Sequence, residues 1–221
     1  MQQRPILAII FDHDGTLVDS EPVHHAMWRN TLANYGVELS RRTYQTDLSG
    51  RPTIDSARRL VQKHQLSIEP EVLCQQKLDA IAAHLSHTPF PLIDGVLPML
   101  TWLGQKPIPL AVASGASAHE VNHSLNAHGI TGFFKAVATR NDVRHNKPAP
   151  DVYLHAAAQL GVAPEHCLAI EDSDSGQSAA VAANMRCLRL PSHTTLAPSP
   201  LCYAIDHIGE VQAWLQNTSQ F

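Results

Sequence analysis

The fold is decided by the stretch Ile6-Leu7-Ala8-Ile9-Ile10-Phe11-Asp12-His13-Asp14-Gly15-Thr16. Its first part is an apolar run rich in branched side chains, which predicts a strand buried in a parallel sheet. Asp12 and Asp14 follow at the carboxyl end of that strand, the edge where open α/β sheets bind ligands. Two carboxylates held close together repel each other unless a cation or a shared proton offsets them. Because Mg²⁺ prefers carboxylate oxygens, the stretch favours a magnesium site, although Asp and Gly are also ordinary turn residues.

The chain changes character after this first strand, because the next part has no convincing strand pattern. It predicts helices over residues 21–35, 40–48, 53–65 and 69–85. Ser20 is the expected N-cap of the first of these helices and Ser40 that of the second, while Gly36 is expected to end the first. We therefore expect a small helical domain over residues 19–91, inserted directly after the first strand.

Strand and helix patterns alternate in the remainder of the chain. Strands are expected over residues 108–113, 133–139, 167–170 and 186–190, and helices over 96–103, 118–128, 151–160, 175–184 and 208–216. This alternation predicts βαβ units and a parallel sheet, that is, an α/β protein with a Rossmann-like core. The core comprises residues 1–18 and 92–221, and residues 191–200, rich in Ser, Thr and Pro, predict an irregular surface loop.

Three of the expected strands end in polar residues. Asp12 and Asp14 follow the first strand, Ser114 the second, and Glu171 with Asp172 a later one. Right-handed crossovers bring these carboxyl ends to one edge of the sheet, so the side chains are expected to converge. Taken singly, each has a plain structural interpretation, such as acids favouring a helix N-terminus. Together they predict a functional site at this edge of the sheet.

These residues resemble the motifs of the haloacid dehalogenase superfamily, and within it the phosphatases similar to β-phosphoglucomutase, which carry a helical cap. The matching motifs are Asp12-His13-Asp14-Gly15-Thr16, Ser114, Lys147-Pro148 and Glu171-Asp172-Ser173. They occur in the family's order and span nearly the whole chain. The resemblance implies that residues 19–91 form the cap of an enzyme acting on phosphate esters.

The resemblance also implies a role for each motif residue. Asp12 is the expected nucleophile, which forms an aspartyl-phosphate, and Asp14 the expected general acid and base. Ser114, the Gly115 backbone N–H and Lys147 are expected to hold the phosphoryl oxygens.

The expected cofactor is Mg²⁺. Its implied ligands are Asp12, the carbonyl of Asp14, Asp172 and, with it, Glu171. The dehalogenases and phosphonatases of the superfamily have no acid at the position that corresponds to Asp14. The presence of Asp14 therefore favours phosphate esters as substrates.

The cap distinguishes a phosphatase from a mutase. β-Phosphoglucomutases carry a Lys-Gly-x-x-Arg pattern there, where this chain has Ser49 and Thr53 at the two cationic positions. The lysine of the mutase Ser-x-Ser-Lys-Asn motif is also missing. Simple hydrolysis is therefore favoured, although Gly50 and Arg51 are candidate substrate-binding residues and Arg51 could restore an anion contact. His24 matches a cap histidine that assists proton transfer in those mutases, and is a candidate substrate contact.

His13 lies between the two aspartates, and its role stays open. If strand alternation continues, its side chain points away from theirs. It could instead contact substrate, as loop residues near a site often do.

Composition limits the remaining alternatives. The 221 residues carry a net charge of −4, which provides no basic field for nucleic acid, and no apolar stretch is long enough to span a membrane. The four cysteines form no CxxC pair and no signal-peptide pattern is present, which predicts reduced thiols in a cytoplasmic protein. We expect a monomer or weak homodimer whose partner is a small phosphorylated metabolite, and a non-catalytic metabolite sensor is the alternative from another class.

Overall fold

The computed structural model describes residues 4–191 and 199–218, and the chain divides into two compact units. One unit comprises Met1–Asp19 with Pro91–Phe221, and the other Ser20–Phe90. The expected domain limits, after residue 18 and after residue 91, lie one residue away from these.

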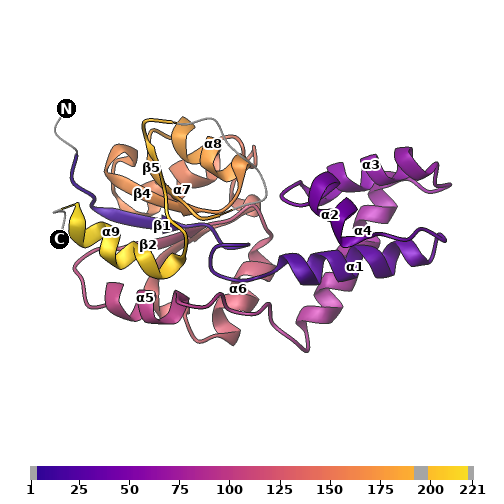
Figure 1. The fold of residues 1–221 in the computed structure, drawn as a ribbon, viewed down its shortest axis with the longest axis horizontal. Coiled ribbons are helices and arrows are strands. Elements are labelled where there is room, and N and C mark those ends of the chain that lie inside the picture. Colours follow the sequence, from indigo (N-terminus) through magenta and orange to yellow (C-terminus); the bar gives the residue numbers. More distant parts are fainter. Residues whose placement is uncertain (1–3, 192–198, 219–221) are drawn as a thin grey trace. The chain divides into compact units, whose positions relative to one another are not determined.

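The first unit is built on a parallel sheet, which confirms the predicted α/β fold class. The six strands of the described residues run in the order β3-β2-β1-β4-β5-β6 (Figure 1). They are β1 (Ala8–Phe11), β2 (Leu110–Ala113), β3 (Phe134–Ala138), β4 (Cys167–Glu171), β5 (Arg186–Arg189) and β6 (Cys202–Ala204). The central strands β1, β2 and β4 are buried along their whole length, as their continuous apolar runs predict.

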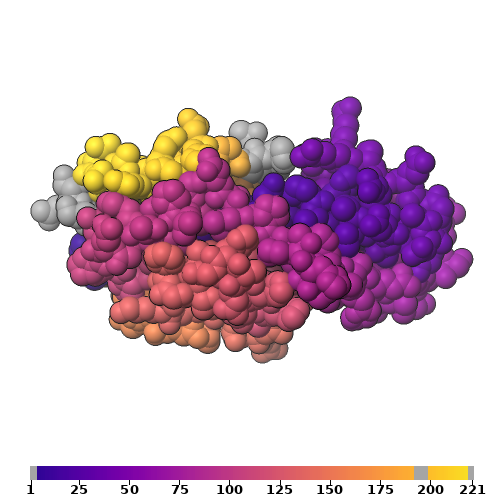
Figure 2. All heavy atoms as spheres, turned by 90° about the horizontal axis from the view of Figure 1, so that it is seen from below, coloured from indigo at the N-terminus to yellow at the C-terminus, as the bar shows by residue number. Residues whose placement is uncertain are grey.

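Helices cover both faces of this sheet, with α7 and α8 on one face and α5, α6 and α9 on the other (Figure 1). They are α5 (Val96–Leu103), α6 (Ala118–Ala127), α7 (Asp151–Leu160), α8 (Asp174–Ala182) and α9 (Val211–Asn217). Short 3₁₀ turns lie at Thr131–Phe133, Arg140–Asp142, Pro164–His166 and Ile208–Glu210. Figure 2 shows the α5 and α6 segments, pink to salmon, on the face of this unit turned to the viewer.

The core beneath α7 and α8 consists largely of alanine. Ala156 and Ala157 of α7 and Ala179 and Ala180 of α8 pack in one cluster with strand residues such as Ala169. Small side chains on both sides let the helices approach the sheet closely, which holds the strand ends in a defined position.

The second unit is a bundle of four helices. They are α1 (Glu21–Ala33), α2 (Arg41–Asp47), α3 (Thr53–His64) and α4 (Pro70–Leu85). Its core gathers Trp28 and Leu32 from α1, Leu60 from α3 and Leu73 from α4. No helix of the described chain is both long and apolar enough to cross a membrane.

One of the three expectations for helix ends differs from the structure. Ser40 accepts a hydrogen bond from the Thr43 N–H and caps α2 as predicted, but the side chain of Ser20 makes no capping bond to α1. Ser20 itself has helical backbone angles, and a residue in that conformation does not aim its hydroxyl at the first turn. Gly36 terminates α1 as predicted. It has a φ of +69°, its N–H donates to the Ala33 carbonyl over 3.1 Å, and the Val37 N–H donates to the Leu32 carbonyl over 3.2 Å.

The C-terminal part also differs from the expectation. The sequence pattern did not predict β6, a three-residue strand at the edge of the sheet. The expected helix over 208–216 begins with a 3₁₀ turn, and α9 starts only at Val211. Most of the expected loop over 191–200 lies outside the described residues.

Candidate active site

The candidate site lies where β1 and β4 run side by side. The chain crosses from β2 and β3 on one side of β1 to β4 on the other, so this is the point where the strand order reverses. Ligands of open α/β sheets bind at such points, outside the carboxyl ends of the strands. Asp12 follows β1 and its N–H donates to the Ile170 carbonyl over 2.9 Å, while Glu171 ends β4. Two carboxylates are therefore fixed on adjacent strands.

One lysine joins these two carboxylates. The Nζ of Lys147 lies 2.5 Å from Oδ1 of Asp12 and 2.6 Å from Oε1 of Glu171. The three side chains are only 7%, 8% and 0% exposed. Nζ also lies 4.9 Å from the ring centroid of Tyr153, whose hydroxyl donates to Oε1 of Glu171 over 3.0 Å. The structure thus brings together three residues from three separated motifs.

The two carboxylates share this cation unequally. Burial raises the pKa of Asp12 to about 7, with a further contribution from the Glu171 charge, and Lys147 only partly opposes both. Burial also disfavours ionisation of Glu171, but Lys147 and Ser173 hold the pKa of Glu171 below its usual value. The two carboxylates in turn raise the pKa of Lys147, against the effect of burial. Glu171 is therefore the carboxylate that Lys147 keeps ionised. The ionised form of Asp12 requires a further cation to stabilise it.

Glu171 is saturated with hydrogen bonds. Besides the bonds to Oε1, its Oε2 accepts from the N–H of Asp172 at 3.0 Å and from the N–H and hydroxyl of Ser173 at 2.9 and 3.0 Å. Ser173 in turn caps α8 by accepting from the Gly176 N–H at 3.0 Å. The helix start and the carboxylate therefore hold each other in place.

Gly176 provides a test of this arrangement. A Cβ atom at this position would overlap the carboxylate of Glu171. Alanine gains about 1 kcal/mol of helix propensity over glycine, but overpacking costs about 1–3 kcal/mol. We expect Gly176→Ala to destabilise the protein by up to about 2 kcal/mol and to lower activity, because Glu171 must move away from Lys147. Urea unfolding and a rate assay measure the two effects.

Gly132→Ala is the matched control for that variant, since nothing lies within 4 Å of a Cβ there. It is expected to change stability by at most about 0.5 kcal/mol. A Gly176→Ala protein as stable and active as this control would contradict the close packing of α8 on Glu171.

An acidic cluster beside Lys147 has the chemistry of a cation site. Asp12, Glu171 and Asp172 each offer a carboxylate oxygen, and these oxygens all lie within 4.8 Å of one another. Oδ1 of Asp172 is buried and makes no hydrogen bond to any described residue. Burial, followed by the charges of Glu171 and Asp12, raises the pKa of Asp172 well above its usual value. A buried carboxylate oxygen without a donor, beside further carboxylates, fits a hard divalent cation such as Mg²⁺.

Gly15 explains why the loop after β1 approaches Asp172 so closely. It has a φ of +82°, and a Cβ atom there would overlap the Asp172 carboxylate. Only glycine combines this backbone conformation with that approach.

The loop after β2 is tied to the lysine loop by a residue that the sequence analysis missed. Asn146 donates from Nδ2 to the Gly115 carbonyl at 3.0 Å and accepts at Oδ1 from the Lys147 N–H at 2.9 Å. Ser114 is fully buried, and its hydroxyl oxygen accepts from the Ala116 N–H at 2.9 Å. The position of Asn146 beside the Lys147-Pro148 motif was the available sequence signal.

His13 and Asp14 contact each other next to the cluster. Nδ1 of His13 lies 3.2 Å from Oδ2 of Asp14, and the imidazole is completely buried. Although burial opposes the charged imidazolium, Asp14 raises the pKa of His13. The carboxylate of Asp14 is not part of the acidic cluster, and the expected metal contact of Asp14 was through its backbone carbonyl.

The three candidate residues of the cap belong to the helical unit. His24 lies on α1 with its Nδ1 3.1 Å from Nζ of Lys77 and its ring centroid 5.3 Å from that of Phe90. Gly50 and Arg51 lie between α2 and α3 and are exposed. The structure does not bring His24 together with these two in one described contact.

Lys77 is a second residue that the sequence analysis missed. It is only 3% exposed, although lysine is rarely buried. A signal was present, because Leu73, Lys77, Ile81 and Leu85 follow one another at four-residue spacing and form the buried face of α4.

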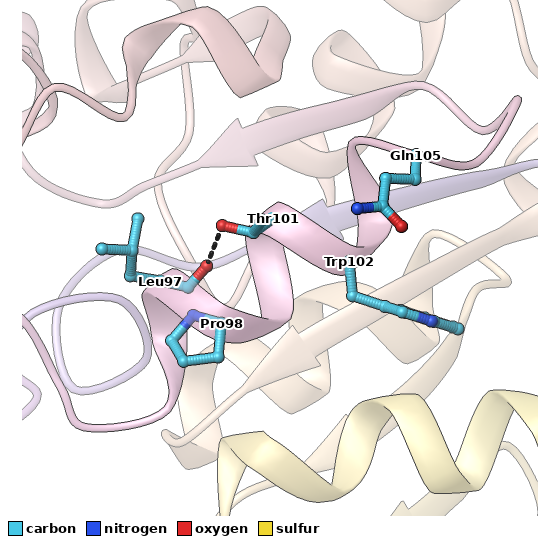
Figure 3. A pocket seen from close by; sticks show the side chains of 5 residues that line it. All are labelled: Leu97, Pro98, Thr101, Trp102 and Gln105. Atoms are coloured by element: carbon cyan, nitrogen blue, oxygen red, sulfur yellow. Dashed lines mark hydrogen bonds between the residues drawn. The ribbon is translucent and has the colours of Figure 1, made fainter.

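A surface hollow on α5 has none of this chemistry. It measures about 490 Å³ and is lined by Leu97, Pro98, Thr101, Trp102 and Gln105 (Figure 3). The Thr101 hydroxyl points toward the backbone of its own helix and donates to the Leu97 carbonyl over 2.8 Å (Figure 3). No lining residue is titratable, so we place the candidate active site at the acidic cluster.

A Rossmann-like parallel sheet with an acidic, lysine-bridged cluster at its switch point is typical of an α/β enzyme. The chain belongs to the haloacid dehalogenase-like hydrolase family, whose sequence model matches residues 9–190. The resemblance inferred from the motifs is thereby confirmed, and the protein is an enzyme of this hydrolase family.

Named phosphatases are among its relatives. The chain is 37% identical over 180 residues to the fructose-1-phosphate phosphatase YqaB of Escherichia coli K12, covering 80% of this chain and 92% of that protein. It is 35% identical over 192 residues to hexitol phosphatase B of the same organism, covering 86% and 85%. The fold matches a β-phosphoglucomutase structure from Clostridium difficile with a TM-score of 0.81 at 22% identity, covering 96% of both chains.

Proposed function

We propose that this protein is a Mg²⁺-dependent phosphatase that hydrolyses the phosphate ester of a small phosphorylated sugar, sugar alcohol or sugar acid. The observation that carries the proposal is the buried Asp12 carboxylate, held by Lys147 and lying beside Asp172. A carboxylate so placed is oriented by one cation and can be neutralised by a second. That combination suits a nucleophile that must attack an anionic phosphate.

Asp12 is the nucleophile in this proposal. One of its oxygens attacks phosphorus, the bond from phosphorus to the ester oxygen breaks, and an aspartyl-phosphate remains on Asp12. Asp14 donates its proton to the departing ester oxygen and then takes a proton from the water that attacks the aspartyl-phosphate. Oδ2 of Asp14 lies against the buried His13, so the imidazole orients the carboxylate for both proton transfers.

Three further groups stabilise the transferring phosphoryl group. The ammonium of Lys147 and the hydroxyl of Ser114, with the Gly115 N–H, bind its oxygens. Asn146 keeps the Gly115 loop and Lys147 in one position, so these donors are preorganised. Asp12, Asp172 and the Asp14 carbonyl would hold Mg²⁺, which when bound would supply positive charge to offset the phosphoryl oxygens and the attacking carboxylate.

Glu171 acts mainly through Lys147 in this proposal. Both of its oxygens already accept hydrogen bonds from protein groups, so less of its capacity remains for a cation than at Asp172. We therefore assign it the positioning of Lys147 and a supporting charge near the metal.

The substrate class rests on the relatives and on the cap. A fructose-1-phosphate phosphatase and a hexitol phosphatase at 35–37% identity support a phosphorylated sugar or sugar alcohol. His24, Gly50 and Arg51 are proposed substrate contacts of the helical unit. We also propose that the protein is cytoplasmic. We propose that it is a monomer or a weak homodimer, in which each chain contains a complete site.

The test is phosphate release from a panel of hexose, hexitol and sugar-acid phosphates, with Mg²⁺ and with chelator. We expect release by the wild-type protein with Mg²⁺ and loss of release with chelator, with hexose or hexitol phosphates turned over best. Asp12→Asn serves as the inactive control. A contaminating phosphatase would release as much phosphate in the Asp12→Asn preparation as in the wild-type preparation.

The other outcomes identify the alternatives. Isomerised ester without free phosphate, dependent on a sugar bisphosphate, would replace the proposal by a phosphomutase. Binding of phosphorylated sugars without any turnover would replace it by a metabolite sensor. Equal rates with Mg²⁺ and with chelator would remove the metal from the proposal.

A further inference from the structure

Two cysteines face each other on the last two strands of the sheet. Cys187 of β5 and Cys202 of β6 are register partners, and the Cys187 N–H donates to the Leu201 carbonyl over 2.8 Å. Paired residues of neighbouring strands project their side chains to the same face. The two thiols are accordingly neighbours on one face of the sheet, and neither is in a disulfide.

The spacing of the pair is compatible with a disulfide. Neighbouring strands lie about 4.8 Å apart, within the range of about 4.4–6.8 Å between the Cα atoms of disulfide-bonded cysteines. In the sheet formed by the described strands, β6 is an edge strand that pairs only with β5. It can therefore move slightly toward β5 without breaking another strand pair.

The two thiols differ in accessibility and acidity. Cys187 is completely buried, whereas Cys202 is partly exposed. The hydrogen bond from the Cys187 thiol, with further contributions from Ser199 and Arg189, lowers the pKa of Cys202 to about 7. The same hydrogen bond, together with burial, raises the pKa of Cys187 well above its usual value. Cys202 is therefore the thiol that becomes a reactive thiolate near neutral pH.

We propose that Cys202 and Cys187 form a redox-responsive dithiol, in which Cys202 reacts with peroxide and Cys187 resolves the product into a disulfide between β5 and β6. In the first step a bond forms between Cys202 sulfur and a peroxide oxygen, the O–O bond breaks, and hydroxide leaves. In the second step the Cys187 sulfur displaces the hydroxyl group from Cys202 sulfur, and that group leaves with the Cys187 proton as water. The two thiols together lose two electrons, which the peroxide gains.

The proposal does not depend on the proposed hydrolysis. The family match ends at residue 190, and Cys202 lies beyond it. The disulfide would thus covalently join the family's core to the strand that follows it.

The other two cysteines are internal controls. Cys167 is buried, its thiol donates to the Ala163 carbonyl, and burial raises the pKa of Cys167 to about 12. Cys74 is half-buried in the helical unit. Neither has a cysteine as its strand partner, so neither is expected to form a disulfide within the folded chain.

The experiment is treatment of the folded protein with hydrogen peroxide, alkylation of remaining thiols, and peptide mapping under non-reducing conditions. We expect a cross-linked peptide pair that contains Cys187 and Cys202, reversed by dithiothreitol. Cys74→Ser, the matched control, should give the same cross-link. Cys187→Ser should give none and should instead accumulate a sulfenic acid on Cys202, trapped by dimedone.

A second comparison separates the hydrogen bond from the packing. Serine at position 187 keeps a donor to Cys202 and alanine does not, so Cys202 should be alkylated severalfold more slowly in Cys187→Ala than in Cys187→Ser at pH 7. Peroxide treatment of the wild type that leaves Cys202 unmodified, or that oxidises it without linking it to Cys187, would overturn the proposal.

Discussion

Replacing Asp12 with asparagine is expected to lower phosphate release by roughly 10³-fold or more while the protein stays folded. The amide does not attack phosphorus and carries no charge for a metal, whereas its oxygen can still accept a hydrogen bond from Lys147. Phosphate release with Mg²⁺ measures the activity. Circular dichroism and urea unfolding measure whether the variant is folded.

The same variant carries a prediction about pH. In the metal-free folded protein the pKa of Asp12 is raised to about 7 from its usual value of 3.8, so the protonated form is favoured by folding. This contribution to the free energy of unfolding is present below about pH 4 and is lost as pH rises to about 7. The Asp12→Asn variant has no ionisable group at this position, so its free energy of unfolding does not fall in this pH range. With chelator at pH 8 it should therefore be at least as stable as the wild type.

Asp206→Asn is the matched control, because Asp206 is an exposed aspartate of the same unit. It should keep wild-type activity and stability. An Asp12→Asn protein that is folded and turns over at a near-wild-type rate would remove Asp12 as the nucleophile. A strong loss of stability at pH 8 with chelator would contradict the raised pKa of Asp12.

The second large effect is expected for Lys147→Met. Methionine has about the same length but leaves Asp12 and Glu171 buried side by side without their shared cation. Breaking a buried ion pair by removing one partner costs about 3–5 kcal/mol. We expect a loss of stability of this order with chelator at pH 8, together with a loss of activity of roughly 10²-fold or more. Urea unfolding and phosphate release measure the two.

The double variant Lys147→Met/Glu171→Gln tests the cause. It removes one of the two uncompensated carboxylates, so it should recover part of the stability and none of the activity. Lys135→Met, at an exposed lysine of β3, is the control and should behave as the wild type. If the single variant were as stable as this control, the lysine would not compensate the buried charges.

Much of the fold was predictable because its signals are local. Side-chain periodicity predicts the strand before Asp12 and the alternation of strands and helices after residue 92. The segments expected as strands and as helices are strands and helices in the structure. The expected limits of α5 and α7 agree with the structure at both ends. The short strand β6 was missed, since three residues at a sheet edge leave little periodic pattern and are held by pairing with β5.

The residues of the site were predictable as a set, since each lies at the end of a strand or in a recognisable motif. Their individual contacts were not. Tyr153 and Asn146 reach Glu171 and Gly115 from segments 18 and 31 residues away in the chain. No local pattern encodes a hydrogen bond of that separation.

The sequence by itself therefore determined the fold class, the family and the acidic and basic groups available for chemistry. Only the tertiary structure decided how those groups share their charges. Lys147 lies within hydrogen-bond distance of both Asp12 and Glu171, and Glu171 receives the additional donors. Asp12 consequently has the raised pKa and Glu171 the lowered one. The physical reason is that burial and charge-charge distances, which set a pKa, exist only after strands far apart in the sequence have been packed side by side.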